Sequence, residues 1–330
     1  MATLGLQFLV LAIIVAGAGT LLARAADAIA DATGLGRLLV GSVLLAAATS
    51  LPELAVDVAA VRAGHADLAA GDLFGSSLMN LLILAGIDLC QNTGRKMLSR
   101  EAASHALSAT LAIAVTGLAG CAILTAGKLP AVSFSGIGGW SWAILIAYLL
   151  GARMLFIDQR ISVRLAADEM PKERGGIFRP AAIFLVAAAV LLTAGPRLAA
   201  VAADLADRSS LGGTFVGTTL VAVTTSLPEL VASLAAVRLG AIDLAIGNVF
   251  GSNAFNMIMF VPLDAACPGS LFEAVSPAHA VTAFAVIVAT AIAVLGQLYH
   301  AEKRLPVIEP DALLVILVIG GALALVFQLS

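Results

Sequence analysis

Two glutamates lie inside apolar stretches of the chain and are the first candidates for chemistry. Glu53 and Glu229 each end the same five-residue sequence, Thr-Ser-Leu-Pro-Glu, and no Lys or Arg occupies a matching position. An ionisable side chain in the middle of a membrane helix costs at least ~2.5–3.5 kcal/mol and persists when it is paired, hydrated or bound to an ion. One alternative is a pair of protonated glutamates that bond neighbouring helices. Because the glutamates are duplicated, we favour a cation site.

Hydroxyl and amide side chains are spaced four residues apart beside these glutamates, so each pair shares one helix face. The pairs are Thr49 with Glu53, Ser76 with Asn80, Thr225 with Glu229 and Ser252 with Asn256. A site built only of oxygen atoms suits hard cations such as Ca²⁺ or Na⁺ and does not favour zinc or copper.

Prolines precede both glutamates. Pro52 and Pro228 lack an N–H group, so the carbonyls of Ala48 and Thr224 are expected to lose their helical partners and to face a cavity or an ion. Small residues that permit close helix approach accompany the polar pairs, namely Gly71, Gly75, Gly247 and Gly251.

These residues belong to an internal repeat. Residues 41–80 match residues 217–256 without a gap, and 22 of the 40 positions are identical. Such a match indicates duplication of one structural unit.

The elements that position these residues are predicted to be transmembrane helices. The chain has 330 residues, of which 61% are hydrophobic and 12% charged. A soluble domain carries roughly a quarter charged residues, so the composition excludes that class. The net charge of −3 gives no basic patch for nucleic acid. Three cysteines and four histidines indicate neither a disulfide framework nor a zinc site.

We expect an all-α polytopic membrane protein with about ten transmembrane helices. The first apolar run has no Lys or Arg before it, so we expect a retained helix and not a cleaved signal peptide. The predicted spans are 5–23, 37–62, 67–89, 102–124, 138–157, 180–207, 213–238, 243–265, 278–298 and 309–328. Sorting the 18 basic residues by membrane face gives 14 on one side and 4 on the other. The positive-inside rule then places both termini outside the cytoplasm.

Five helices per half is an odd number, so the two repeats must be inverted. We predict a first repeat at 1–157 with its motif at 41–80, a cytoplasmic linker at 158–179, and a second repeat at 180–330 with its motif at 217–256. Inverted repeats are typical of secondary transporters, which hold their substrate near the midplane where the repeats meet.

The duplicated motifs resemble the two alpha-repeats of the cation/Ca²⁺ antiporter superfamily, and specifically its prokaryotic Na⁺/Ca²⁺ exchanger branch. The resemblance covers essentially the whole chain. It implies Ca²⁺/Na⁺ exchange by alternating access, with the first and sixth helices sliding over a core that holds the ions. The implied cation ligands are Thr49, Ser50, Glu53, Ser76, Asn80, Thr225, Ser226, Glu229, Ser252 and Asn256, together with the backbone carbonyls of Ala46 and Ala222.

The chain departs from the family pattern at a few positions. Asn256 stands where the well-understood prokaryotic exchangers have an aspartate, and Asp72 and Ser77 stand where the family usually has asparagines. Two glutamates balance one Ca²⁺ or two Na⁺, whereas three Na⁺ leave one positive charge over. The coupling ion therefore stays open between Na⁺, H⁺ and K⁺. Asp72 either joins the site or is a hydrated carboxylate at the outer mouth of its helix.

The sequence thus predicts a multi-pass antiporter in a bacterial or archaeal inner (plasma) membrane, exchanging Ca²⁺ for Na⁺. The alternatives are an H⁺- or K⁺-coupled divalent cation exchanger and a passive cation channel, in which the oxygen atoms form a filter. An enzyme is not predicted, since no catalytic Ser/His or H-E-x-x-H arrangement is present. We expect no cofactor apart from the transported Ca²⁺ and Na⁺, and no partner besides these ions and the lipid bilayer.

Overall fold

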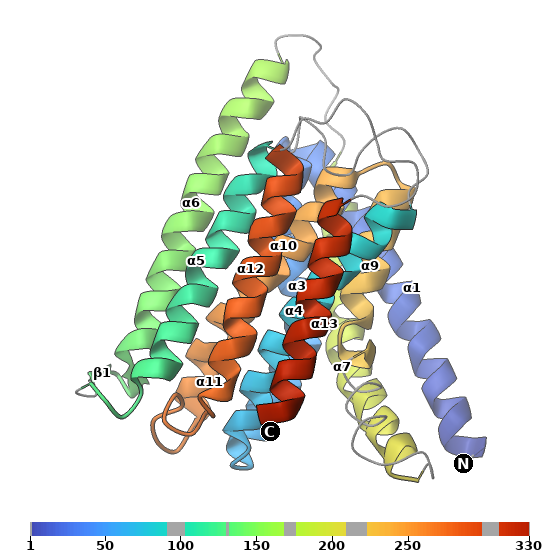
Figure 1. Cartoon of the computed structure of the whole chain (residues 1–330). Coiled ribbons are helices and arrows are strands. Elements are labelled where there is room, and N and C mark those ends of the chain that lie inside the picture. The colour runs from blue at the N-terminus through green and yellow to red at the C-terminus, as the bar shows by residue number, and fades with distance from the viewer. Residues whose placement is uncertain are drawn as a thin grey trace.

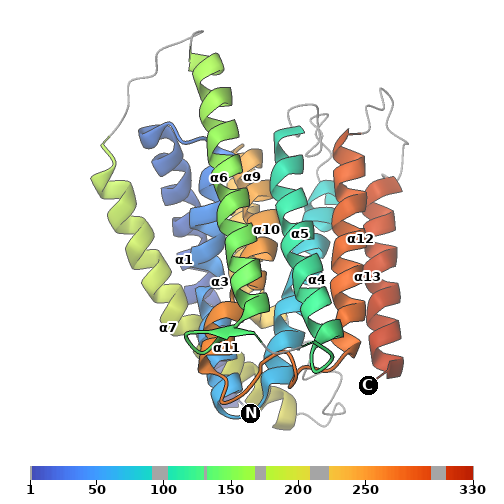
Figure 2. The ribbon, with the colours of Figure 1, turned by 90° about the vertical axis from the view of Figure 1, so that its left-hand side faces the viewer.

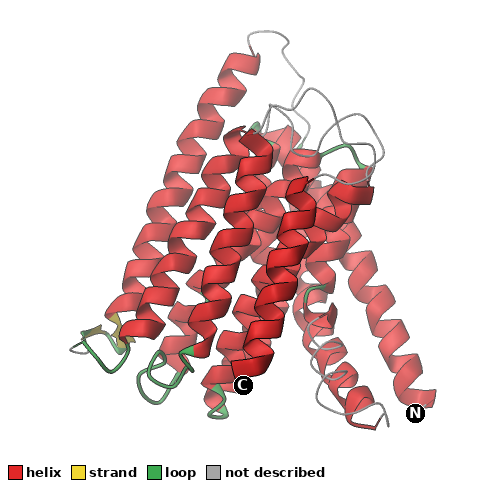
Figure 3. Ribbon diagram, viewed as in Figure 1, coloured by secondary structure: helices red, strands yellow, loops and turns green. Residues whose placement is uncertain are grey.

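The computed structural model describes residues 2–90, 103–129, 132–167, 176–208, 223–298 and 310–329. Nearly all of them are helical, and the long helices run roughly side by side from one end of the molecule to the other (Figures 1 and 3). Eight of the described helical stretches are long and apolar enough to cross a membrane. The all-α polytopic prediction is confirmed.

The first half contains α1 (Ala2–Thr33), α2 (Arg37–Leu39), the π-helical segment η1 (Val40–Leu45), α3 (Ala46–Arg62), α4 (Ala66–Cys90), α5 (Ala103–Thr125), strands β1 (Ser133–Phe134) and β2 (Ile137–Gly138), and α6 (Gly139–Ala167). The second half contains α7 (Phe178–Arg208), α9 (Leu227–Arg238), α10 (Ile242–Ile258), α11 (Phe260–Ala266), α12 (Ala278–Leu298) and α13 (Pro310–Leu329). The strands form an antiparallel hairpin in which Ser133 pairs with Gly138.

The helices that carry the duplicated motifs form the interior. In the most apolar window of α10 and α11, 83% of residues are buried, against 22% in α6 and 28% in α1. α10 contacts α3, α4, α9 and η1, whereas α1 and α7 pack against each other at one side of the bundle (Figure 2). The predicted first and sixth helices therefore lie next to the motif helices, α1 against α9 and α7 against α3.

The two repeats use the same turn at opposite ends of the bundle. Gly64 after α3 has φ +89° and its counterpart Gly240 after α9 has φ +75°, a region that favours glycine. The turns place Asp67 at the start of α4 and Asp243 at the start of α10. His279 Nε2 of α12 lies 3.1 Å from Asp67 Oδ1, and the Nε2 atom of the α5 histidine, His105, lies 3.1 Å from Asp243 Oδ1.

Close backbone contacts join the repeats at the motif glycines. A Cβ atom on Gly247 would lie 2.6 Å from the carbonyl oxygen of Leu38, and one on Gly251 would lie 2.4 Å from the backbone of Ser42. Only glycine fits at these two positions, so α10 crosses η1 with its backbone nearly in contact. The prediction of close approach is confirmed for these two glycines, whereas Gly75 meets nothing within 4 Å among the described residues.

The two prolines differ in their helical context. Pro52 lies inside the continuous helix α3, as predicted. Pro228 instead lies in the first turn of α9, because the helical residues 223–225 are separated from α9 by a turn at Ser226. Proline is tolerated in a first turn, where its missing N–H has no helical partner to lose. The second motif helix is therefore interrupted at its Thr-Ser pair, two residues before Pro228.

Candidate cation site

The two motif glutamates are fully enclosed by the central helices. Glu53 on α3 is 1% exposed and Glu229 on α9 is 0% exposed. Among the described residues, neither glutamate takes part in an ion pair with Lys, Arg or His. Two buried carboxyl groups without a basic partner need another source of positive charge, which is a proton or a bound cation.

A serine hydroxyl group donates a hydrogen bond to one oxygen of each glutamate. One of these serines belongs to the same repeat as its glutamate, and the other belongs to the opposite repeat. Ser76 of α4 donates to Glu53 Oε1 at 2.8 Å, within the first repeat. Ser50 of α3 donates to Glu229 Oε1 at 3.0 Å, across the repeat interface. These contacts bring both glutamates to the junction of α3, α4 and α9.

The two motif asparagines form hydrogen bonds through their amide nitrogens and not through their amide oxygens. Asn80 Nδ2 donates to Asn253 Oδ1 at 3.0 Å, and Asn256 Nδ2 lies 3.4 Å from both the carbonyl oxygen of Leu73 and Ser77 Oγ. Because the amide nitrogens are engaged, the Oδ1 atoms of Asn80 and Asn256 are left as acceptors without a donor.

Six predicted ligand residues each keep a buried oxygen atom that has no hydrogen-bond partner. A buried polar atom in that condition ordinarily costs about 1–3 kcal/mol, so each instance needs an explanation. The atoms are Glu53 Oε2, Glu229 Oε2, Asn80 Oδ1, Asn256 Oδ1, Ser226 Oγ and Ser252 Oγ. All six belong to the set that the sequence nominated for cation binding, and oxygen atoms of this kind are ligands that a hard cation accepts.

The remaining predicted ligands are placed as follows. The hydroxyl group of Thr49 lies 3.2 Å from the carbonyl oxygen of Ala46 and 3.4 Å from Asn248 Oδ1, which puts Ala46 at the start of α3 beside the motif. Thr225 is buried at 6% exposure in the turn region before α9. Ala222 lies outside the described residues.

A second layer of polar residues supports the site and was not nominated from the sequence. Asn248 Nδ2 donates to Ser233 Oγ at 3.0 Å, and Asn253 Nδ2 donates to the carbonyl oxygen of Ser77 at 3.1 Å. Ser233 lies four residues after Glu229, so the same-face spacing that selected Thr225 could also have found it. Asn248 and Asn253 occupy the positions of Asp72 and Ser77 in the other repeat. Comparison of the two repeats at these positions could therefore have nominated both asparagines.

The candidate site offers oxygen atoms as its ligands. Within the described part of the chain, no group of three or more His, Cys, Asp or Glu side chains gathers around one point. The oxygen atoms come instead from two carboxylates, several hydroxyl groups and two amides. That donor set is weakly charged for its size, which suits an ion that must leave again.

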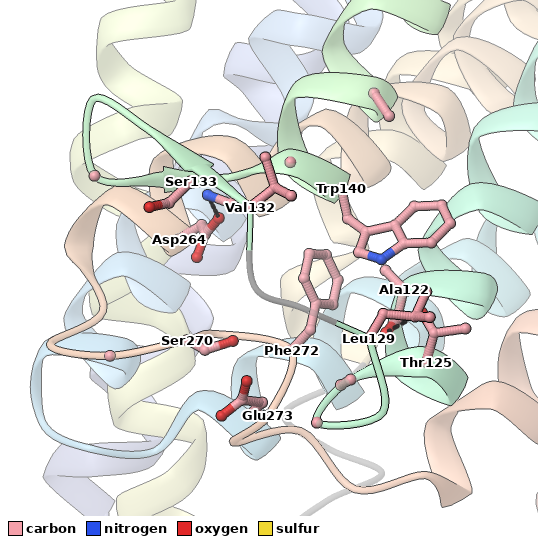
Figure 4. A pocket seen from close by; sticks show the side chains of 17 residues that line it. Ala122, Thr125, Leu129, Val132, Ser133, Trp140, Asp264, Ser270, Phe272 and Glu273 are labelled. Carbon is pink, nitrogen blue, oxygen red and sulfur yellow. Dashed lines mark hydrogen bonds between the residues drawn. The ribbon is translucent and has the colours of Figure 1, made fainter.

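One described pocket is not part of this set. Figure 4 shows a pocket of about 620 Å³ between the α5–β1–α6 region and the segment after α11, lined by Trp140, Phe272 and Glu273 among others. Its buried carboxylate, Asp264, accepts hydrogen bonds from Gly138 N and Ser141 Oγ, both at 2.7 Å. Asp264 therefore holds the hairpin onto α11, and the pocket contains none of the predicted ligands.

A bundle of membrane-spanning helices in which duplicated motifs enclose buried oxygen atoms is typical of a secondary transporter. The chain matches the model of the sodium/calcium exchanger protein family over residues 3–162 and 179–327. The chain belongs to that family, and it is a multi-pass membrane protein of the cation/Ca²⁺ antiporter type.

Individual relatives agree with this assignment. The chain is 29% identical to inner membrane protein YrbG of Escherichia coli over 253 residues, covering 73% of each chain. It is 27% identical to the putative antiporter CaxA of Alkalimonas amylolytica, covering 71% of each, and 25% identical to the sodium/calcium exchanger MaX1 of Methanosarcina acetivorans, covering 73% of this chain and 76% of that protein. A structure of the sodium-calcium exchanger NCX_Mj has the same fold, with a TM-score of 0.70 at 20% identity over 98% of this chain and 99% of that chain.

Proposed function

We propose that this protein exchanges Ca²⁺ for Na⁺ across an inner membrane by alternating access. The observation that carries the proposal is the set of six unpartnered buried oxygen atoms on the duplicated motifs, two of which belong to Glu53 and Glu229. Both ions would use the same oxygen atoms, because competition for one site is what couples their transport. The names of two relatives, an exchanger of sodium and calcium and a putative antiporter, support this choice.

Charge balance gives the coupling its physical basis. The two glutamates supply two negative charges, which one Ca²⁺ or two Na⁺ would neutralise. Moving net charge through an apolar barrier is expensive, so a loaded, neutral core crosses more readily than an empty, doubly charged one. An empty site that cannot cross forces each Ca²⁺ transfer to be followed by return of the other cation, which is obligatory exchange.

The orientation proposed from the basic residues fits the same scheme. The N and C labels lie at one end of the bundle in both views (Figures 1 and 2). We assign that end to the outside, and residues 158–179 to a cytoplasmic linker between the repeat units 1–157 and 180–330. α6 extends to Ala167, so the first part of that linker is helical.

The deciding experiment is uptake of radioactive Ca²⁺ into proteoliposomes that contain the purified protein. Vesicles loaded with Na⁺ should accumulate Ca²⁺, whereas K⁺-loaded vesicles without a pH gradient should not. Uptake that is independent of any internal counter-ion would establish a channel and refute antiport. Uptake driven by K⁺ or by a pH gradient alone would keep the site and reject Na⁺ as the coupling ion.

A further inference from the structure

An asparagine side chain binds a cation only when its oxygen, and not its nitrogen, faces the ion. Asn80 and Asn256 are both buried, and each keeps an Oδ1 atom without a hydrogen-bond partner. The two ends of an amide group are similar in size, so packing alone does not decide which end points to the site. The residues that contact these amides must therefore determine their orientation.

A backbone carbonyl fixes the orientation of the Asn80 amide through one intermediate residue. The carbonyl oxygen of Ser77 can only accept, so Asn253 must turn its Nδ2 atom toward it, at 3.1 Å. Asn253 Oδ1 then points the other way and accepts from Asn80 Nδ2 at 3.0 Å. With its nitrogen engaged, Asn80 can offer only its oxygen to an ion. Asn80 follows Ser76, the donor to Glu53, by one helical turn and so shares its face of α4.

A second chain of hydrogen bonds orients Asn256. Ser77 Oγ donates to the carbonyl oxygen of Leu73 at 2.8 Å. Because the hydroxyl proton is used there, Ser77 Oγ can only accept from Asn256 Nδ2, which lies 3.4 Å away. The Leu73 carbonyl oxygen, also 3.4 Å from that nitrogen, is likewise an acceptor. Ser77 and Asn253 occupy the same position in their repeats, and each contacts the motif asparagine of the other repeat.

The two chains of hydrogen bonds keep the same order of donors and acceptors although their middle residues differ. One passes through a serine hydroxyl group and the other through an amide, yet both begin at a backbone carbonyl of α4 and end at an unpartnered Oδ1 atom. The side chains of Ser77, Asn80, Asn253 and Asn256 are all 0% exposed, so bulk water does not contact them. Packing does not require residues of different size to share this order, whereas orientation of an amide does.

We propose that Ser77 and Asn253 are positioning residues that commit the amide oxygens of Asn256 and Asn80 to the cation site. The inference rests on the proposed exchange function. An amide turned the other way would present its N–H donors to the site and would repel Ca²⁺ and Na⁺ alike. Amides that are oriented before the ion arrives need no reordering when it binds. Ser77 and Asn253 therefore raise the affinity for the cation without adding charge to the site.

The chain itself supplies a conservative replacement for Asn253. Asn253→Ser copies Ser77: its hydroxyl group can donate to the carbonyl oxygen of Val249, one turn back, and still accept from Asn80 Nδ2. Asn253→Ala removes the acceptor and leaves the Asn80 amide free to turn. Asn253→Leu, which has a similar volume and no acceptor, is the second variant if the alanine variant does not fold. Thr290→Ala, which removes a buried hydroxyl group bonded within α12, is the matched control.

The first measurement is the Ca²⁺ concentration that gives half of the Ca²⁺-induced rise in the unfolding midpoint of the purified protein. Loss of any buried hydrogen bond lowers the midpoint without Ca²⁺, so the half-effect concentration is the informative quantity. It should rise roughly 10–100-fold in Asn253→Ala, the usual range for partners of metal ligands, and stay close to the wild-type value in Asn253→Ser and Thr290→Ala. In Na⁺-loaded proteoliposomes, Asn253→Ala should raise the KM for Ca²⁺ more than it lowers the maximal rate.

A second measurement separates orientation from general support of the structure. Asn80→Asp removes the need for orientation, because both oxygens of a carboxylate are acceptors. Asn253→Ala should therefore weaken Ca²⁺ binding when residue 80 is asparagine, and should not weaken it in the Asn80→Asp background. A residue that only supported the fold would cause the same loss in both backgrounds.

Three results would each overturn the positioning role. They are wild-type Ca²⁺ affinity in Asn253→Ala, equal losses in the alanine and serine variants, and equal losses in the two residue-80 backgrounds. Failure of the exchange function is a separate result, because it appears as absence of counter-ion-driven uptake in the wild type, whereas the unfolding assay reports Ca²⁺ binding without any transport.

Discussion

Replacing either central glutamate by glutamine is expected to abolish Ca²⁺ transport while leaving the fold intact. Glu53→Gln and Glu229→Gln each keep the side-chain volume and an oxygen acceptor, and each removes one of two negative charges carried by side chains that are at most 1% exposed. Bound Ca²⁺ would then keep one uncompensated positive charge. Removing one partner of a buried ion pair costs about 3–5 kcal/mol, which corresponds to roughly 10²–10⁴-fold weaker binding.

The assay is initial uptake of radioactive Ca²⁺ into Na⁺-loaded proteoliposomes at a Ca²⁺ concentration near the wild-type KM. Uptake by either variant should fall to a few per cent or less, whereas Glu273→Gln, which changes an exposed carboxylate after α11, should transport normally. Size-exclusion profiles and thermal unfolding midpoints check that the variants are folded. If both glutamine variants keep uptake within tenfold of the wild type, the charge-balance reasoning and the site assignment are refuted.

Two further predictions concern helix packing and the serine hydroxyl groups that donate to the two glutamates. Ser50 donates to Glu229 in this structure, and Ser226 is the corresponding donor for Glu53 if the two repeats exchange conformations. Gly195→Val should lower the unfolding midpoint and the transport rate, because a Cβ atom there would lie 2.5 Å from Pro52 Cβ and overpacking costs about 1–3 kcal/mol. Gly17→Val is the control, since nothing lies within 4 Å of a Cβ atom at that position. Equal effects of the two changes would contradict the contact between Gly195 and Pro52. Ser50→Ala and Ser226→Ala should raise the apparent KM for Ca²⁺ on opposite membrane faces, measured by uptake in right-side-out and inside-out vesicles, because the repeats are inverted. Equal changes on both faces in both variants would argue against this exchange of partners.

The sequence predicted the helices well where apolar residues continue to the helix ends. The predicted spans 37–62 and 278–298 match the observed bounds. α1 instead runs on to Thr33, beyond the expected end at residue 23, because charge ends an apolar run without ending a helix. Asp27 and Asp31 in this extension pair with Arg37 at the start of α2. Hydropathy measures the apolar barrier, whereas the helix also includes residues that lie in the polar interface.

The π-helical segment and the break between α10 and α11 were not predicted. An extra residue in a turn leaves no mark on residue type in a mostly apolar segment such as Val40–Leu45. The break at Met259 likewise falls inside one apolar run. The candidate site, in contrast, could be predicted because the motif is duplicated. A single Ser, Thr or Asn in a membrane helix often bonds to its own backbone or packs between helices, whereas recurrence of each polar pair in both repeats indicates a common function.

The difference between the two glutamates has a cause that sequence comparison alone cannot supply. Both motifs read Thr-Ser-Leu-Pro-Glu, yet Glu53 accepts from Ser76 of its own repeat and Glu229 accepts from Ser50 of the other. The corresponding alternative donors, Ser252 for Glu229 and Ser226 for Glu53, are buried without partners.

Exchanging the conformations of the two inverted repeats converts one set of bonds into the other with no net loss of hydrogen bonds. Two states that make equal numbers of equivalent bonds differ little in free energy, so bound ions can shift the population between them. Identical motifs in inverted repeats would thus provide the near-degenerate states that the proposed alternating access requires, and the asymmetric bonding of Glu53 and Glu229 is what one member of such a pair would show.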